Sequence, residues 1–172
     1  VDDQQIVRQG LGTILLYEED ITVVGEAGDG LEAVTLARSL QPDVVLMDLK
    51  MPRLGGIPAT RQIREALPDT RVIILTTYDT DDLVFEAIKA GANGYLLKDA
   101  TREVLADAIR GVVRGESQLD PTVARKVLNE FQRLAGAIPA RRQRPRDEAA
   151  MEPLTPADLV ALALLVEGLY NN

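Results

Sequence analysis

The sequence of 172 residues contains no cysteine, no histidine and no tryptophan. Without cysteine or histidine the chain cannot form a disulfide, use a thiol nucleophile or a Ser-His-Asp triad, hold zinc in a Cys/His site, or carry a phosphohistidine. Aromatic residues make up only 3% of the chain, which excludes an aromatic stacking platform for single-stranded nucleic acid. Its chemistry must therefore depend on carboxylates, hydroxyls and lysines.

Basic patches and membrane signals are also scarce. The formal net charge is −8, from 19 Lys and Arg against 27 Asp and Glu, so the composition indicates no basic face for duplex DNA. The longest apolar run, Leu159 to Val166, is too short to cross a bilayer, and no signal peptide opens the chain. We expect a cytoplasmic protein without a membrane partner. Because the sequence starts at Val1 and stops abruptly at Asn172, we also expect further residues at both ends.

Short apolar runs alternate with amphipathic helical patterns over residues 1–114. Their β-branched residues and their apolar character on both faces indicate parallel strands covered by helices. The runs are Ile21–Ala27, Val44–Met47, Val72–Leu75 and Gly94–Leu97, and Val1 is interpreted as the end of a first strand. The sequence therefore predicts an α/β fold with a doubly wound, five-stranded parallel sheet.

The rest of the chain divides into three parts. Residues 119–136 form a connecting region whose helix runs from Pro121 to Leu134, with proline at its start and Gly136 after its end. Residues 137–153 lose helical periodicity and read as a linker. Leu154 to Gly168 forms a further helix that is apolar almost all round and needs a domain around it.

Reactive side chains follow the predicted strands. Ligands of open α/β sheets bind outside the carboxyl ends of the strands, so these residues should meet at one edge. They are Asp2 and Asp3 after Val1, Asp48, Thr76 and Lys98. Three carboxylates this close repel one another, by about 4 kcal/mol per pair at ~4 Å and an effective dielectric constant of ~20, unless a cation joins them. A small oxygen-ligated site favours Mg²⁺, and a carboxylate beside Mg²⁺ and lysine can attack phosphorus, which makes Asp48 the predicted nucleophile.

Two other chemistries remain open at this point. Gly25, Gly28 and Gly30 follow a strand, as in a dinucleotide-binding module, although their order differs from G-x-G-x-x-G. An Asp-nucleophile phosphohydrolase would carry a second acid two residues after the nucleophile, where this chain has Lys50.

Several separate motifs resemble the receiver domains of two-component response regulators. The segment Val44 to Pro52 is similar to the phosphoacceptor segment of that family, and Thr76 and Lys98 lie at the family's spacing from Asp48. Gly91 to Asp99 and Val23 to Ala27 resemble the NarL/FixJ, or LuxR-type, branch. The resemblance implies a flavodoxin-like receiver domain over residues 1–118.

The resemblance also implies residue roles. Asp48 would accept a phosphoryl group from a histidine kinase, and Mg²⁺ would be held by Asp3, Asp48 and the backbone carbonyl of Lys50, with Asp2 binding through a water. Thr76 and Lys98 would bind the phosphoryl oxygens, and Thr76 and Tyr95 would form the switch. The protein would not be an enzyme beyond its own autocatalytic phosphoryl transfer and autodephosphorylation.

The C-terminal residues 154–172 resemble the start of a LuxR-type helix-turn-helix domain. The recognition helix is not in the chain, so no DNA-binding residue is assigned. The resemblance implies a transcription regulator that binds DNA through its full C-terminal domain and pairs as a homodimer when phosphorylated. The alternative is a receiver that acts only through protein–protein contacts, without DNA.

Overall fold

The computed structural model describes residues 1–78 and 80–136, and within them a parallel sheet forms the centre of the fold. Its strands are β1 (Val44–Met47), β2 (Arg71–Thr76), β3 (Gly94–Leu97) and β4 (Gln118–Leu119), paired in that order. The register places Met47 beside Ile74, and Thr76 beside Leu97. Val72, Ile73 and Ile74 are fully buried, as expected for a parallel strand covered on both faces.

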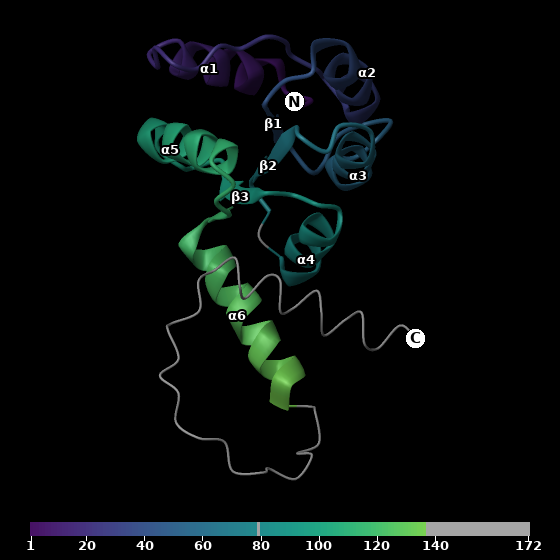
Figure 1. Cartoon of the computed structure of the whole chain (residues 1–172), viewed down its shortest axis with the longest axis vertical. Coiled ribbons are helices and arrows are strands. Elements are labelled where there is room, and N and C mark those ends of the chain that lie inside the picture. The colour runs from purple at the N-terminus through teal and green to yellow at the C-terminus, as the bar shows by residue number, and fades with distance from the viewer. Residues whose placement is uncertain (79, 137–172) are drawn as a thin grey trace.

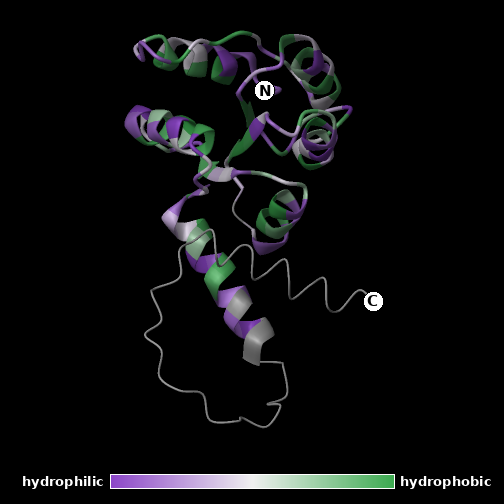
Figure 2. Cartoon of the chain, viewed as in Figure 1, coloured by the Kyte–Doolittle hydropathy of each residue, from purple (hydrophilic) through white to green (hydrophobic). Residues whose placement is uncertain are grey.

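Helices cover both faces of the sheet. Figure 1 shows α1 (Gln5–Leu15) and α5 (Arg102–Val113) together on one side, and α2 (Gly30–Leu40), α3 (Gly56–Ala66) and α4 (Asp81–Lys89) on the other. Each side has its own apolar core: Leu15, Leu105 and Val112 belong to the first, and Val34, Ile63 and Val84 to the second. The apolar strands and the two-coloured helices in Figure 2 reflect this layering. The predicted doubly wound α/β fold is thus confirmed.

Two of the five predicted strands are not part of the described sheet. Neither Val1 nor residues 21–27 form strand pairs, and the four strands of the described residues are three predicted ones together with β4. Val1 donates from its ammonium group to the Leu46 carbonyl and accepts from the Asp48 N–H, while the Asp2 N–H donates to the Ala27 carbonyl.

A cavity of about 440 Å³ lies beside this extended segment. It is lined by residues 20–27, by Val44 to Leu46 of β1 and by side chains of α1, α2 and α5. Val1 stands between the segment and β1, as the interpretation of Val1 as a strand end requires. Residues 21–27 line this cavity, and within the segment Val23 and Val24 are 41% and 56% exposed while Ala27 is buried.

The predicted connecting helix is α6 (Pro121–Gly136), which follows the short strand β4 that the sequence pattern did not predict. Val123 and Val127 of α6 are buried in the core on the α4 side, and Lys126 lies 3.6 Å from Asp81 at the start of α4. The predicted linker (137–153) and helix-turn-helix segment (154–172) lie outside the described residues. Among the described residues, no helix combines the length and apolarity needed to span a membrane.

Candidate phosphoacceptor and metal site

The three predicted carboxylates come together at the carboxyl end of the sheet. Asp48 directly follows β1, and the hydrogen bonds of Val1 to Leu46 and Asp48 place Asp2 beside it. Oxygen atoms of Asp2, Asp3 and Asp48 all lie within 4.8 Å of one another. Asp2 and Asp48 are only 1% and 4% exposed, whereas Asp3 faces solvent. The cluster is therefore buried on one side and open on the other.

Lys98 joins two of these carboxylates. Its ammonium nitrogen lies 2.6 Å from Asp2 Oδ2 and 3.2 Å from Asp48 Oδ2, and its side chain is 15% exposed. The backbone fixes this position, because the Lys98 N–H donates to the Thr76 carbonyl at 2.9 Å. Burial alone would lower the pKa of Lys98, but the hydrogen bond to Asp2 and the charge of Asp48 outweigh it and raise that pKa above its usual value. Lys98 is thus a fixed cation at the rim of the site.

The donor set fits a hard divalent cation. One oxygen of Asp48, Oδ1, is buried without a hydrogen-bond partner among the described residues. An orphaned buried carboxylate oxygen is costly, and Lys98 supplies one positive charge for three carboxylates. Oxygen ligands of this kind suit Mg²⁺ or Ca²⁺. The residues present therefore have both the unsatisfied atom and the excess negative charge that a bound cation would balance.

The predicted switch residues are linked through Tyr78. Thr76, the last residue of β2, is fully buried, and its hydroxyl oxygen accepts a long hydrogen bond of 3.4 Å from the Tyr78 N–H. Tyr95 in β3 is also fully buried, and its hydroxyl donates to the Tyr78 carbonyl at 2.5 Å. Both side chains thus bond to the backbone of Tyr78, the second residue after β2.

Two features of the site were not predicted from the sequence. The Lys50 ammonium lies 3.7 Å from the centre of the Tyr78 ring, a cation–π contact that joins the loops after β1 and β2. Gly56, at the start of α3, packs so closely on the Asp48 carbonyl that a Cβ atom there would lie 1.9 Å from its oxygen. The pair Gly55-Gly56 after Asp48 was a visible signal for such a close approach, but nothing in the sequence pattern pairs Lys50 with Tyr78.

Comparison with known protein families gives one match over most of the sheet. Residues 1–110 match the family model of the response regulator receiver domain. This range contains Asp2, Asp3, Asp48, Thr76 and Lys98, together with β1, β2 and β3.

Curated relatives and solved structures extend this likeness. The chain is 46% identical over 171 residues to YxjL, an uncharacterized transcriptional regulatory protein of Bacillus subtilis (strain 168), covering 99% of this chain and 75% of that protein. It is 44% identical over 172 residues to the transcriptional regulatory protein LiaR of the same strain, covering 100% of this chain and 77% of that one. A LuxR-family two-component response regulator from Aurantimonas sp. SI85-9A1 superposes with a TM-score of 0.68 at 37% identity, covering 75% of this chain and 92% of that chain.

Proposed function

Because the chain belongs to the LuxR-type response regulators and carries their receiver domain, we propose that Asp48 is its phosphoacceptor and that the aspartyl phosphate controls transcription. The observation that carries the proposal is the triangle of Lys98, Asp2 and Asp48, with contacts of 2.6 and 3.2 Å. A buried carboxylate beside a fixed ammonium and an open acidic rim is arranged to receive an anionic electrophile.

The phosphoryl donor is a histidine kinase. A carboxylate oxygen of Asp48 forms the new bond to phosphorus while the bond from phosphorus to the imidazole nitrogen of the kinase breaks, and that nitrogen keeps the electron pair. The Lys98 ammonium pairs with the transferred phosphoryl oxygens, and the Thr76 hydroxyl donates a hydrogen bond to one of them. The protein accepts and later loses its own phosphoryl group, so it turns over no separate substrate.

Magnesium is the proposed cofactor of this transfer. Asp3, Asp48 and the backbone carbonyl of Lys50 would bind it directly, and Asp2 would bind it through a water. When bound, Mg²⁺ neutralises negative charge on the phosphoryl oxygens. Support comes from the orphaned Asp48 oxygen and from the three clustered carboxylates.

The proposed output is DNA binding by a complete C-terminal domain. The relatives YxjL and LiaR are named as transcriptional regulatory proteins, and this chain covers 75% and 77% of their lengths. These relatives favour a DNA output over one that acts through protein contacts alone. Phosphorylation adds about −1.5 to −2 charges at Asp48, to which Thr76 and Tyr95 respond, and the phosphorylated protein pairs as a homodimer to occupy two half-sites.

Incubation with acetyl phosphate and Mg²⁺ tests the proposal. The full chain should gain one acid-labile phosphoryl group, and Asp48→Asn should abolish the gain because the amide is not a nucleophile. Lys98→Ala should still bind Mg²⁺ but incorporate phosphate poorly, since it lacks the cation that pairs with the phosphoryl oxygens. Intact-mass spectrometry measures the incorporation, and a phosphoryl group that persists in Asp48→Asn would remove Asp48 from its role.

A further inference from the structure

Tyr78 contacts three residues of the site at once. Its ring faces the Lys50 ammonium at 3.7 Å, its carbonyl accepts from the Tyr95 hydroxyl at 2.5 Å, and its N–H donates to the Thr76 hydroxyl at 3.4 Å. The first contact reaches the loop that leaves Asp48, and the other two reach the switch residues. Tyr78 therefore connects the phosphoacceptor loop to the switch through its ring on one side and its backbone on the other.

We propose that the Lys50–Tyr78 contact is a latch that holds the segment after β2 in place and opens when Asp48 is phosphorylated. The inference rests on the proposed function, because it requires a phosphoryl group at Asp48. In the unphosphorylated protein the Lys50 ammonium lies on the Tyr78 ring. In the phosphorylated protein the same ammonium turns to the phosphoryl oxygens and leaves the ring.

The relative strengths of the two contacts give the direction of this change. A cation–π contact at an exposed site shifts an equilibrium by about 2- to 5-fold, and Tyr78 is 37% exposed. A hydrogen bond from an ammonium to a charged oxygen is worth about 10-fold or more. The phosphoryl group brings about −1.5 to −2 charges to a position two residues from Lys50. The Lys50 ammonium therefore binds the phosphoryl oxygens in preference to the Tyr78 ring.

The two lysines of the site differ in their freedom to move. Lys98 is 15% exposed and is held between Asp2 and Asp48. Lys50 is exposed and carries its ammonium on a flexible four-carbon stem. Lys98 is thus in place before phosphorylation, whereas Lys50 can exchange one partner for another.

Loss of the Lys50–Tyr78 contact affects the switch residues Thr76 and Tyr95 and the helix α4. When the ring contact is lost, Tyr78 keeps its hydrogen bonds to Thr76 and Tyr95, the two residues that respond to phosphorylation. The same segment leads into α4, which begins at Asp81, and Asp81 pairs with Lys126 of α6. The Lys50 latch therefore ties the chemistry at Asp48 to the surface formed by α4 and α6.

Binding of beryllofluoride, a phosphoryl mimic, to the full chain with Mg²⁺ tests the latch through a double-mutant cycle. Because the free state loses the ring contact on binding, Tyr78→Leu should lower the concentration for half-occupancy by about 2- to 5-fold. In the Lys50→Met background the same Tyr78→Leu change should have no effect, since no ammonium is left to hold. Tyr78→Phe keeps a ring and both backbone groups and should bind as the wild type does. An equal effect of Tyr78→Leu in both backgrounds overturns the latch.

Proton NMR of the Lys50 side chain gives a readout that does not depend on affinity. Its ε protons should be shifted upfield by the Tyr78 ring in the free protein, and the shift should disappear in Tyr78→Leu and on addition of beryllofluoride with Mg²⁺. If beryllofluoride binds and the upfield shift remains, the latch is wrong while the proposed function stands. If beryllofluoride does not bind the wild type, or binds Asp48→Asn equally well, the proposed function fails and the latch fails with it.

Discussion

The backbone of Asp48 is fitted closely to a single glycine. Gly56 opens α3 and donates from its N–H to the Leu49 carbonyl at 2.9 Å, and a Cβ atom at this position would lie 1.9 Å from the Asp48 carbonyl oxygen. Backbone cannot yield as a flexible side chain can, so Gly56→Ala must displace either α3 or the loop that carries Asp48. We expect it to lower the free energy of unfolding by about 1–3 kcal/mol, measured by urea denaturation.

Gly10 supplies the matched control for this substitution. It lies within α1, and no atom approaches a Cβ built there within 4 Å. Gly10→Ala should therefore stabilise the protein by about 0.5–1 kcal/mol, because alanine favours the helix. Equal stabilities for the two variants would show that the close packing at Gly56 is not a constraint.

The individual site residues differ in how far the sequence could place them. The proximity of Asp48, Asp2 and Lys98 could be predicted because each follows a strand that the sequence pattern predicts, and parallel strands end at one edge. The contact of Lys50 with Tyr78 could not, because it depends on the conformations of two loops that no periodic pattern encodes. The roles assigned to Thr76 and Tyr95 stay predictions, while their bonds to Tyr78 are new.

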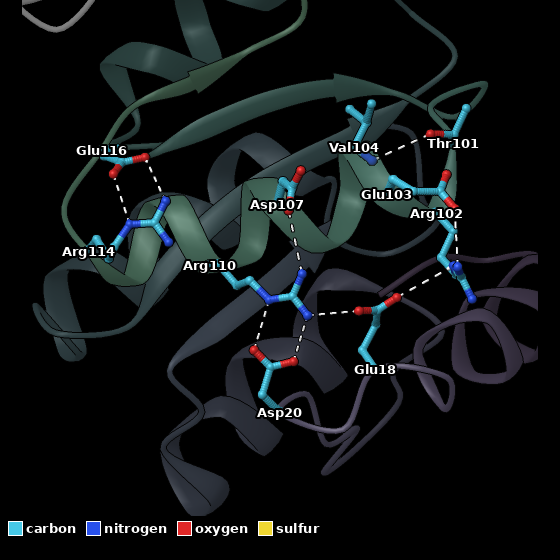
Figure 3. A network of polar contacts seen from close by, with 10 residues as sticks. All are labelled: Glu18, Asp20, Thr101, Arg102, Glu103, Val104, Asp107, Arg110, Arg114 and Glu116. Carbon is cyan, nitrogen blue, oxygen red and sulfur yellow. Dashed lines mark hydrogen bonds and ion pairs between the residues drawn. The ribbon is translucent and has the colours of Figure 1, made fainter.

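At the scale of elements, a polar network ties α5 to the segment after α1. Figure 3 shows Arg110 at its centre, donating to Asp20 from Nε at 2.8 Å and from Nη2 at 2.6 Å, and to Glu18 from Nη2 at 2.7 Å. Glu18 also lies 3.5 Å from Arg102 at the start of α5. Asp20 and Arg110 both line the cavity beside residues 20–27, so the network lies at the edge of that cavity.

The ionisation of Asp20 reports on this network. The side-chain hydrogen bond from Arg110 lowers the pKa of Asp20 from 3.8 to about 2. Because the pKa is lower in the folded protein, the contribution of this pair to stability is present above about pH 3.8 and is lost as the pH falls through about 2. We expect Arg110→Gln to return the Asp20 pKa toward 3.8, measured by NMR titration of the carboxyl carbon.

Arg114 is a suitable control, since it pairs with Glu116 in the turn that follows α5 and not with the segment after α1. Arg114→Gln should leave the titration of Asp20 unchanged. An Asp20 midpoint near 3.8 in the wild type, or the same midpoint in wild type and Arg110→Gln, would contradict the network.

The strands show where sequence patterns succeed and fail at this scale. Val44–Met47 and Gly94–Leu97 form strands with the predicted bounds, and Val72–Leu75 lies within β2, because each has a parallel neighbour. Ile21–Ala27 also contains β-branched residues, but its backbone hydrogen bonds outside regular elements are those of Ile21 to Glu18 and of Asp2 to Ala27, and it pairs with no strand of the described sheet. An apolar run alone therefore predicts neither burial nor strand pairing, since Val23 and Val24 are exposed and a strand needs a partner that local sequence does not specify.

For the whole molecule, the arrangement of α6 connects the receiver fold to the rest of the chain. Val123 and Val127 bury one side of α6 against the core that α4 shares, and Figure 1 shows the remainder of the helix extending away from the sheet. The helix that precedes residues 137–172 therefore packs beside α4, the helix that follows Tyr78 in the sequence.

Dimerisation is the expected consequence at this scale. With beryllofluoride and Mg²⁺, the full chain should sediment at twice the mass of the free protein. A dimer would bring two DNA-binding domains to the two half-sites of an operator. Asp48→Asn should keep the free mass under the same conditions. Analytical ultracentrifugation of both proteins measures this, and an unchanged mass for the beryllofluoride-bound wild type would count against the homodimer.

The most direct test of the phosphoacceptor assignment is to locate the phosphoryl group chemically. Borohydride reduces an aspartyl phosphate to homoserine, so treatment of the acetyl phosphate-reacted protein should convert Asp48 alone, detected by peptide mass spectrometry. Asp2 and Asp3, although they share the cluster, should remain aspartate. Homoserine at either of these positions, or its absence from position 48 in a protein that has gained a phosphoryl group, would contradict the account.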